Sequence, residues 1–205
     1  MYRILIIGLL SATIACPGEP VLGNEGAPVV KVLVTYHSAS GSTEKMAAAV
    51  AEGVKMNAQA HVVMKRVEQV VAEDLFSADA IIVGSPVYWA NMAGEVKTFF
   101  DNWQFKFGVF PDFKMKNKVG AAFTTGGQVS GGKEVTMLTI LAAMLGNHMI
   151  VVSGGGAFGA SATTEGHSPG IDDEELAAAR ILGQRVAEVA MAVKTGLRSH
   201  EPVVP

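Results

Sequence analysis

A strand, a hydroxyl-rich loop and a helix follow one another between residues 29 and 54, and this order constrains the fold more than any other stretch of the chain. Residues 29–35 (VVKVLVT) are mostly β-branched, which is typical of a buried strand. Residues 44–54 (EKMAAAVAEGV) have the spacing of an amphipathic helix. Since the loop between them offers free backbone N–H groups and the positive end of a helix dipole, we expect an anion site there.

The composition of this loop predicts which anion it binds. Its hydroxyl groups can donate hydrogen bonds, while no Lys or Arg lies in the loop itself. A triphosphate with magnesium would require the Walker-type Gly-Lys-Ser/Thr sequence, so neutral donors favour a single phosphate monoester. The residues expected to hold it are Ser38, Ser40, Gly41, Ser42 and Thr43.

Strand and helix patterns alternate along the rest of the chain. Further strands are expected at residues 60–67, 80–85, 118–125 and 148–152. Helices are expected at 94–103, 133–145 and 172–194, with a short helix or turn at 68–77 and Gly196 as the cap of the last helix. Five strands alternating with helices predict an α/β fold with an open, doubly wound parallel sheet.

Ligands of such sheets bind outside the carboxyl ends of the strands, where three unusual loops are expected to meet. The second loop, residues 86–92, holds Tyr88 and Trp89; these rings either cover a flat ligand or pack into the domain or an oligomer interface. The third loop, residues 124–128, lets backbone N–H groups approach a ligand closely, unless it is an ordinary turn. A phosphate at one end and a planar aromatic head at the other match flavin mononucleotide (FMN).

The first 28 residues are expected to lie outside the domain. Residues 1–15 combine one positive charge with a short apolar run, as in a secretory signal peptide, and Cys16 stands where a bacterial lipoprotein carries its lipid. The competing interpretation is a buried N-terminal strand. Residues 16–28 read as a flexible tether, 29–196 as the domain and 197–205 as a tail. The predicted location is therefore exported, either periplasmic or membrane-anchored at Cys16; the alternative is cytoplasmic.

Composition excludes several other classes. The 205 residues suffice for one domain, and the net charge is −3. We find no run of basic residues and expect no nucleic acid as partner. A single cysteine excludes an intramolecular disulfide, and five scattered histidines show no metal-ligand spacing.

Two segments carry a family resemblance. Residues 38–43 (SASGST) resemble the flavodoxin phosphate loop, and residues 79–101 (DAIIVGSPVYWANMAGEVKTFFD) resemble WrbA-type NAD(P)H:quinone oxidoreductases. The resemblance covers residues 29–195 and implies a flavodoxin-like sheet of order 2-1-3-4-5. It also implies bound FMN, NAD(P)H as reductant, a quinone-type acceptor and a homo-oligomer whose neighbouring chains complete the flavin site. The alternative function is that of a flavodoxin-type electron carrier without catalytic activity.

The resemblance also assigns positions around the flavin. An arginine of the family falls on Tyr88, a neighbouring aromatic residue on Trp89, and a flavin-facing histidine on Asn147, which can still donate a hydrogen bond. The family's insertion before the third strand is missing. No side chain is expected to act as acid or base, since the flavin carries the chemistry. The cofactor residues beyond the phosphate loop are Pro86, Val87, Tyr88, Trp89, Asn91, Thr124, Thr125, Gly126, Gly127, Gln128 and Asn147.

Overall fold

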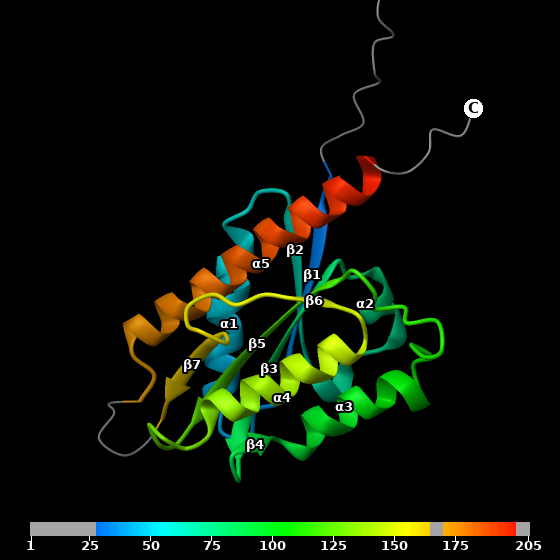
Figure 1. Ribbon diagram of the computed structural model, residues 1–205. Coiled ribbons are helices and arrows are strands. Elements are labelled where there is room, and N and C mark those ends of the chain that lie inside the picture. Colours follow the sequence, from blue (N-terminus) through cyan, green and yellow to red (C-terminus); the bar gives the residue numbers. More distant parts are fainter. Residues whose placement is uncertain (1–27, 165–169, 200–205) are drawn as a thin grey trace, which may run out of the picture.

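A parallel sheet forms the centre of the computed structural model, which describes residues 28–164 and 170–199 (Figure 1). Its order is β2-β1-β3-β5-β6, while β4 pairs with β3 and β7 pairs with β5. The flavodoxin-like doubly wound sheet expected from the sequence is therefore confirmed. The strands are β1 (Val30–Tyr36), β2 (Ala60–Arg66), β3 (Ala80–Tyr88), β4 (Asn91–Met92), β5 (Val119–Gly126), β6 (Ile150–Val151) and β7 (Ala160–Thr163).

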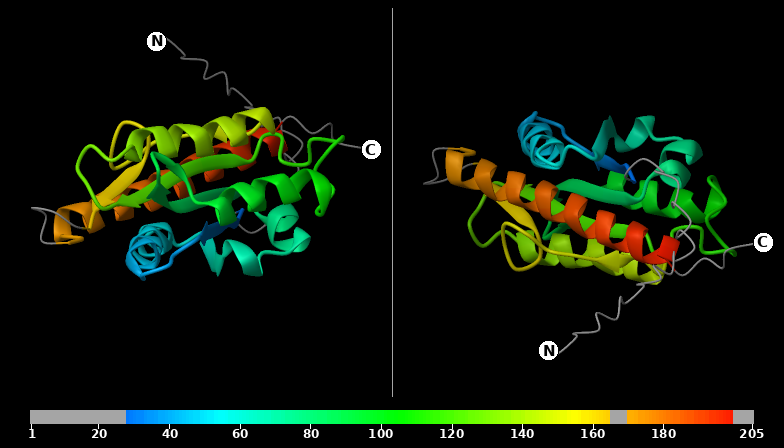
Figure 2. Two further views of the ribbon diagram at one scale, coloured as in Figure 1. Left: turned by 90° about the horizontal axis from the view of Figure 1, so that it is seen from below. Right: turned by 90° about the horizontal axis from the view of Figure 1, so that it is seen from above.

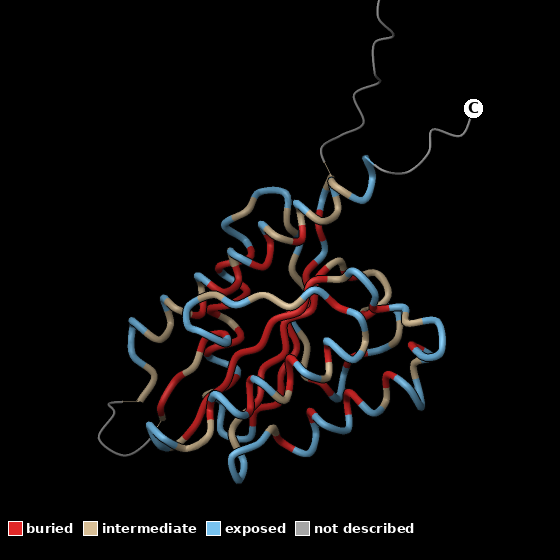
Figure 3. The backbone as a smooth tube through the Cα atoms, viewed as in Figure 1, coloured by how far each residue is buried: buried red, intermediate tan, exposed pale blue. Residues whose placement is uncertain are grey.

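Helices cover both faces of this sheet (Figure 2). One face carries α1 (Ser42–Lys55) and α5 (Asp173–Ser199). The other carries η1 (Val67–Gln69), α2 (Ala72–Ser77), α3 (Gly94–Phe105) and α4 (Lys133–Gly146). The central strands β1, β3 and β5 between the two helical layers are almost entirely buried, whereas the edge strand β2 is partly exposed (Figure 3).

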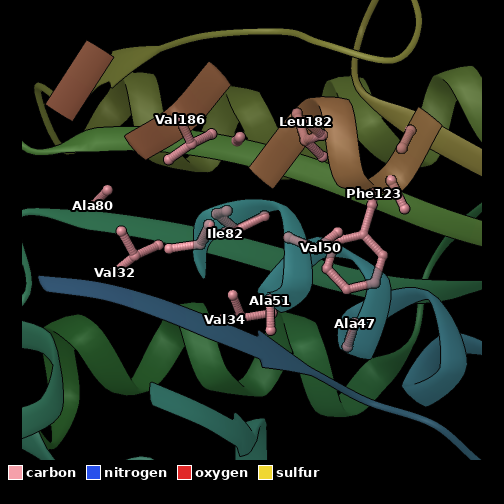
Figure 4. Close-up of a cluster of buried hydrophobic side chains, with 14 of the residues drawn as sticks. Val32, Val34, Ala47, Val50, Ala51, Ala80, Ile82, Phe123, Leu182 and Val186 are labelled. Atoms are coloured by element: carbon pink, nitrogen blue, oxygen red, sulfur yellow. The ribbon is translucent and has the colours of Figure 1, made fainter. Parts of the chain in front are cut away.

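Alternating side chains of each strand supply two separate cores. Val32 and Val34 of β1 join the cluster beneath α1 and α5, whereas Leu33 joins the cluster beneath α2, α3 and α4. In the first cluster Val50 and Phe123 fill the space between the sheet and the two helices (Figure 4). Burial on both faces explains why these strands are continuously apolar.

The fifth strand position differs from the expectation. The sequence predicted one strand at residues 148–152, but β6 pairs only with the start of β5 and β7 pairs only with its end. Glycines at 154–156 and 159 lie between them, and Gly159 has a φ of 139° that side chains rarely adopt. These glycines break the strand into two short pieces.

Two further boundaries also differ. Strand β3 continues to Tyr88, so the expected loop at 86–92 is the end of one strand, a turn and the start of another. Helix α5 passes through Gly196 and ends at Ser199, so Gly196 is not its cap. A Cβ atom at Gly196 would meet nothing within 4 Å, so tertiary packing does not require glycine there.

Candidate functional site

The phosphate loop lies between β1 and α1, at the carboxyl edge of the sheet. Gly41 is the residue before the helix and has a φ of 91°, which allows the chain to turn sharply into α1. The Ser38 hydroxyl accepts hydrogen bonds from the N–H groups of Gly41 (3.1 Å) and Glu44 (3.3 Å). Ser38 therefore shapes the loop, while the first N–H groups of α1 have no partner within the helix and can bind an anion.

A cation that the loop sequence did not reveal stands beside it. Arg66, the last residue of β2, donates a hydrogen bond from its guanidinium to the Ser38 carbonyl oxygen (2.6 Å). The strand register brings it there, since Arg66 is the partner of Tyr36 at the end of β1. The absence of Lys and Arg from the loop thus does not leave the site without positive charge. The sequence could have indicated this position of Arg66, because Arg66 and Tyr36 are the last residues of two adjacent parallel strands.

The second predicted loop is a hairpin with a strained tip. Val87 pairs with Met92 and Tyr88 with Asn91 across a two-residue turn. The turn residues Trp89 and Ala90 have φ values of 52° and 59°. Such turns normally contain Asn or Gly, because each side chain at positive φ costs about 1–2 kcal/mol. Strain of this kind concentrates at functional sites.

The third loop faces this tip across a cleft. A volume of about 420 Å³ is enclosed by the hairpin on one side and the glycine-rich loop on the other. Trp89 is completely exposed, at 102%, and Tyr88 is 42% exposed, so neither ring packs into the core. The residues that line the cleft are Val87, Trp89, Ala90, Gly126, Gly127, Gln128 and Gly131.

Close backbone contacts hold the cleft together. A Cβ atom at Gly132, whose φ is 96°, would lie only 2.6 Å from the Ala90 Cα atom, so the hairpin tip rests directly on the start of α4. The hydroxyl groups of Thr43 and Thr125 share a hydrogen bond of 2.8 Å that joins the phosphate loop to the end of β5. The phosphate loop and the cleft are therefore parts of one continuous site.

The side chains of three predicted residues are not brought into this site. Asn147 caps the far end of the 14-residue α4 and donates from Nδ2 to the Ala143 carbonyl oxygen (2.9 Å). At 1.5 Å per residue it lies about 20 Å along the helix from the cleft of its own chain. The Asn91 side chain is also used elsewhere, because its Oδ1 accepts hydrogen bonds from the Met92 N–H and the Thr139 hydroxyl. Thr124 is fully buried and its hydroxyl has no partner.

A buried lysine behind the cleft was missed. Lys133 is only 6% exposed, and its Nζ donates to the Thr163 hydroxyl. Its stem packs behind Gly126, where a Cβ atom would lie 3.1 Å from Lys133 Cγ. None of the ion pairs formed among residues 28–164 and 170–199 includes Lys133. A buried cation without a carboxylate partner favours negative charge on a ligand in the adjacent cleft.

An acid–histidine cluster lies next to the phosphate loop. The His37 ring contacts Glu68 through Nδ1 (2.7 Å) and Glu95 through Nε2 (3.7 Å). Partial burial raises the pKa of the Glu68 carboxyl, but hydrogen bonds from His37 and its own backbone, with the charges of His37 and Arg66, bring that pKa below its usual value. In the described part of the chain, no three His, Cys, Asp or Glu residues are placed to hold a metal ion.

Comparison with known proteins places the chain in a family. Residues 61–164 match the family model described as NADPH-dependent FMN reductase. A protein named NAD(P)H dehydrogenase (quinone) 3 from Rhizobium meliloti (strain 1021) is 36% identical, over 84% of this chain and 97% of its own length. A flavodoxin from Clostridium saccharobutylicum is 35% identical, over 77% of this chain and 96% of its own.

A solved structure agrees with these relatives. The WrbA-like flavodoxin from Agrobacterium tumefaciens superposes with a TM-score of 0.66 at 27% identity, over 84% of this chain and 99% of its own. The chain belongs to the NADPH-dependent FMN reductase family of flavodoxin-like proteins and, within it, to the WrbA type.

Proposed function

We propose that the protein is an FMN-dependent oxidoreductase that transfers electrons from NAD(P)H to a quinone-type acceptor. The observation that carries this proposal is the strained hairpin tip, which holds an exposed indole over a backbone-lined cleft joined to a phosphate-binding loop. This site fits FMN, because it offers an anion site at one end and a slot for a flat ring at the other. FMN and NAD(P)H are also the groups named by the family and its relatives.

The residues of the chain would divide the work of binding. The N–H groups at the start of α1 and the hydroxyls of Ser40 and Ser42 would hold the phosphate, with Arg66 fixing the loop. Trp89 would cover the ring on one side, and the backbone from Thr125 to Gln128 would contact its polar edge. FMN, when bound, would supply the two-electron redox chemistry between the nicotinamide and the acceptor. Lys133 would favour negative charge on the ring from behind Gly126.

Ser42→Asp tests the site without a threat to the fold. Ser42 is the first residue of α1, where a carboxylate stabilises a helix but repels a bound phosphate. We expect the variant to be purified without flavin and to unfold at the same temperature as the flavin-free wild type or higher. Ser199→Asp, at the other end of the fold, is the matched control and should retain its yellow colour. A Ser42→Asp variant that keeps its full FMN content would contradict the site.

A flavodoxin-type electron carrier is the second candidate. The alignment with the Rhizobium relative spans 212 positions, although it includes only 84% of the 205 residues of this chain. The remaining positions are gaps in this chain, so that relative has segments that this chain lacks. The Clostridium flavodoxin aligns over 160 residues that make up 77% of this chain. Steady-state oxidation of NAD(P)H with a quinone separates the two functions, because a carrier binds FMN but does not turn over.

We further propose a homo-oligomer built through α3 and α4. Val135, Leu138 and Leu145 are half exposed on α4, and a groove of about 540 Å³ separates the two helices and contains Asn147. In such an assembly Asn147 would contact the flavin of a neighbouring chain and not the flavin of its own chain. Leu138→Glu should reduce the mass measured by light scattering, whereas Ile181→Glu, equally exposed on α5, should not. A monomeric wild type would reject the proposal.

Export is proposed on the sequence alone, because residues 1–27 lie outside the described residues. The apolar segment before Cys16 supports a signal peptide, and Cys16 itself supports lipid attachment. No helix within the described part of the chain has both the length and the apolar character to cross a bilayer. Cell fractionation with mass spectrometry of the mature N-terminus tests both points. A cytoplasmic protein that still begins at Met1 would contradict export.

A further inference from the structure

Positive charge gathers at the amino edge of the sheet, opposite the flavin cleft. The last turns of α5 and the segment between α3 and β5 together line a cleft of about 320 Å³ there. Four lysines and one arginine line this cleft together with a single carboxylate, although the whole chain has a net charge of −3. The charged residues are Asp79, Lys114, Lys116, Lys118, Lys194 and Arg198.

The one carboxylate that lines this cleft is already engaged. Asp79 Oδ2 accepts hydrogen bonds from the Lys31 N–H (2.8 Å) and from Lys194 Nζ (2.7 Å). Lys118 Nζ donates to the carbonyl oxygens of Phe76 and Ala78. Burial lowers the pKa of Lys118, with the charge of Asp79 opposing and that of Lys194 adding to the effect. The positive charge of this edge that no described carboxylate balances therefore lies on Lys114, Lys116 and Arg198.

Three of those cations face solvent. Lys114, Lys116 and Arg198 are exposed, and none takes part in an ion pair among the described residues. Lys114 Nζ lies 5.0 Å from the centre of the Phe76 ring, and this cation–π contact does not neutralise its charge. These groups are available to an anionic partner.

Apolar side chains stand beside the cations. Contrary to our expectation that the chain has no such pattern, aromatic and basic residues interleave in residues 105–118 (FKFGVFPDFKMKNK). Phe110 is 53% exposed and is held by an edge contact with Phe113, which stacks on His148. Leu197 and Val29 are exposed to a similar extent. Lysines mixed with exposed apolar groups are typical of surfaces that lie on a membrane.

The N-terminal segment enters the domain at this same edge. Lys194 Nζ donates to the Val29 carbonyl oxygen (2.9 Å), which fixes the start of the domain against the last turns of α5. The preceding 28 residues contain the apolar run that ends before Cys16. Attachment of that run to a bilayer would keep this edge within reach of the lipid, because only the tether expected at residues 16–28 separates the two.

We propose that this amino edge docks on membranes that contain anionic phospholipids. The charge and apolar groups of the folded domain carry the proposal, so it does not depend on lipid at Cys16 or on the proposed function. The eight residues of β5 separate this edge from the cleft by about 25 Å at 3.3 Å per residue. In the docked state the cleft faces water, so its electron acceptor arrives from solution rather than from within the bilayer.

Vesicle flotation with the full chain, expressed so that Cys16 carries no lipid, tests the proposal. We expect tighter binding to phosphatidylcholine vesicles that contain 30% phosphatidylglycerol than to phosphatidylcholine alone. Lys114→Glu/Lys116→Glu should weaken binding to the anionic vesicles at least about thirty-fold, because each lysine near such a surface contributes about five-fold. Lys97→Glu/Arg180→Glu changes the net charge equally at other sites and should bind like the wild type.

Several outcomes would overturn the proposal. Equal binding to neutral and anionic vesicles would mean that the apolar leader, and not the cationic edge, causes the binding. An equal loss of binding in both double variants would mean that the net charge of the protein matters and the position of the lysines does not. Tight binding of a 30-mer DNA duplex without binding to anionic vesicles would identify the edge as a nucleic acid surface instead. Unchanged far-UV circular dichroism in both double variants shows that the comparison is made between folded proteins.

Discussion

The two tryptophans of this protein allow a decisive test of the cleft, because one is fully exposed and the other fully buried. Trp89 is 102% exposed at the hairpin tip, whereas Trp103 is 1% exposed and packs against Phe99 and Phe100 at ring separations of 5.6 and 5.0 Å. Trp89→Ala removes no core contact, so the thermal midpoint of the flavin-free protein should not change. Trp103→Ala should cost about 3–5 kcal/mol of stability.

Flavin binding should be weakened by Trp89→Ala and not by Trp103→Ala. An aromatic stack contributes about 1 kcal/mol, so Trp89→Ala should raise the Kd for FMN about five-fold without abolishing binding. It should also change the fluorescence of bound FMN and reduce quinone turnover. Trp103→Ala, as far as it folds, should bind FMN normally.

Trp103→Phe makes the same test spectroscopic. The buried Trp103 Nε1 has no hydrogen-bond partner, so replacing the indole by phenyl removes an unsatisfied donor and limits the cost of the lost volume. In this variant Trp89 is the remaining indole, and its emission should fall as FMN is added. Our placement would be refuted by a large loss of stability in Trp89→Ala together with unaltered flavin affinity and fluorescence.

Four further predictions use matched or single substitutions. Gly132→Ala should weaken FMN binding, because its Cβ would collide with Ala90, whereas Gly146→Ala in open space on the same helix should leave the Kd unchanged. Gly183→Ala should lower the thermal midpoint, since its Cβ would lie 2.0 Å from the Val50 carbonyl oxygen. Gly196→Ala, in open space, should instead stabilise α5 by about 0.5–1 kcal/mol. A destabilised Gly196→Ala variant would mean that the helix ends before residue 196. Burial raises the pKa of Asp74, but hydrogen bonds from Lys65 and the Val71 N–H outweigh it and hold that pKa below its usual value of about 3.9. The resulting stability is present above that pH and is lost as pH falls through the lowered pKa, so Asp74→Asn should lose stability in urea at pH 7 and flatten the decline below pH 4. Lys133→Met should lower the reduction potential of bound FMN by about 30 mV, the equivalent of about 1.4 kcal/mol for a two-electron couple, and an unchanged potential in spectroelectrochemical titration would exclude its electrostatic role.

The sequence by itself predicted the elements whose signals are local. Apolar strands, a hydroxyl-rich turn and amphipathic helices each depend on neighbouring residues, so the sheet, the phosphate loop and the family follow from patterns within short segments. The loop sequence left open whether Trp89 covers a ligand or packs into the domain, and its exposure shows that it does not pack into the core. Its contact with flavin stays a prediction.

Only the tertiary structure decided which distant residues meet. Arg66 reaches Ser38 because β2 lies beside β1, and Lys133 reaches Thr163 because α4 and β7 both pack against β5; these partners lie 28 and 30 residues apart in the sequence. The structure also separated Asn147 from the cleft, since the length of α4 carries it to the opposite edge. Conversely, the cations of the amino edge come from two segments about 80 residues apart that meet only in the folded chain. Long-range packing determines these contacts, so they cannot be predicted from the pattern of a single segment.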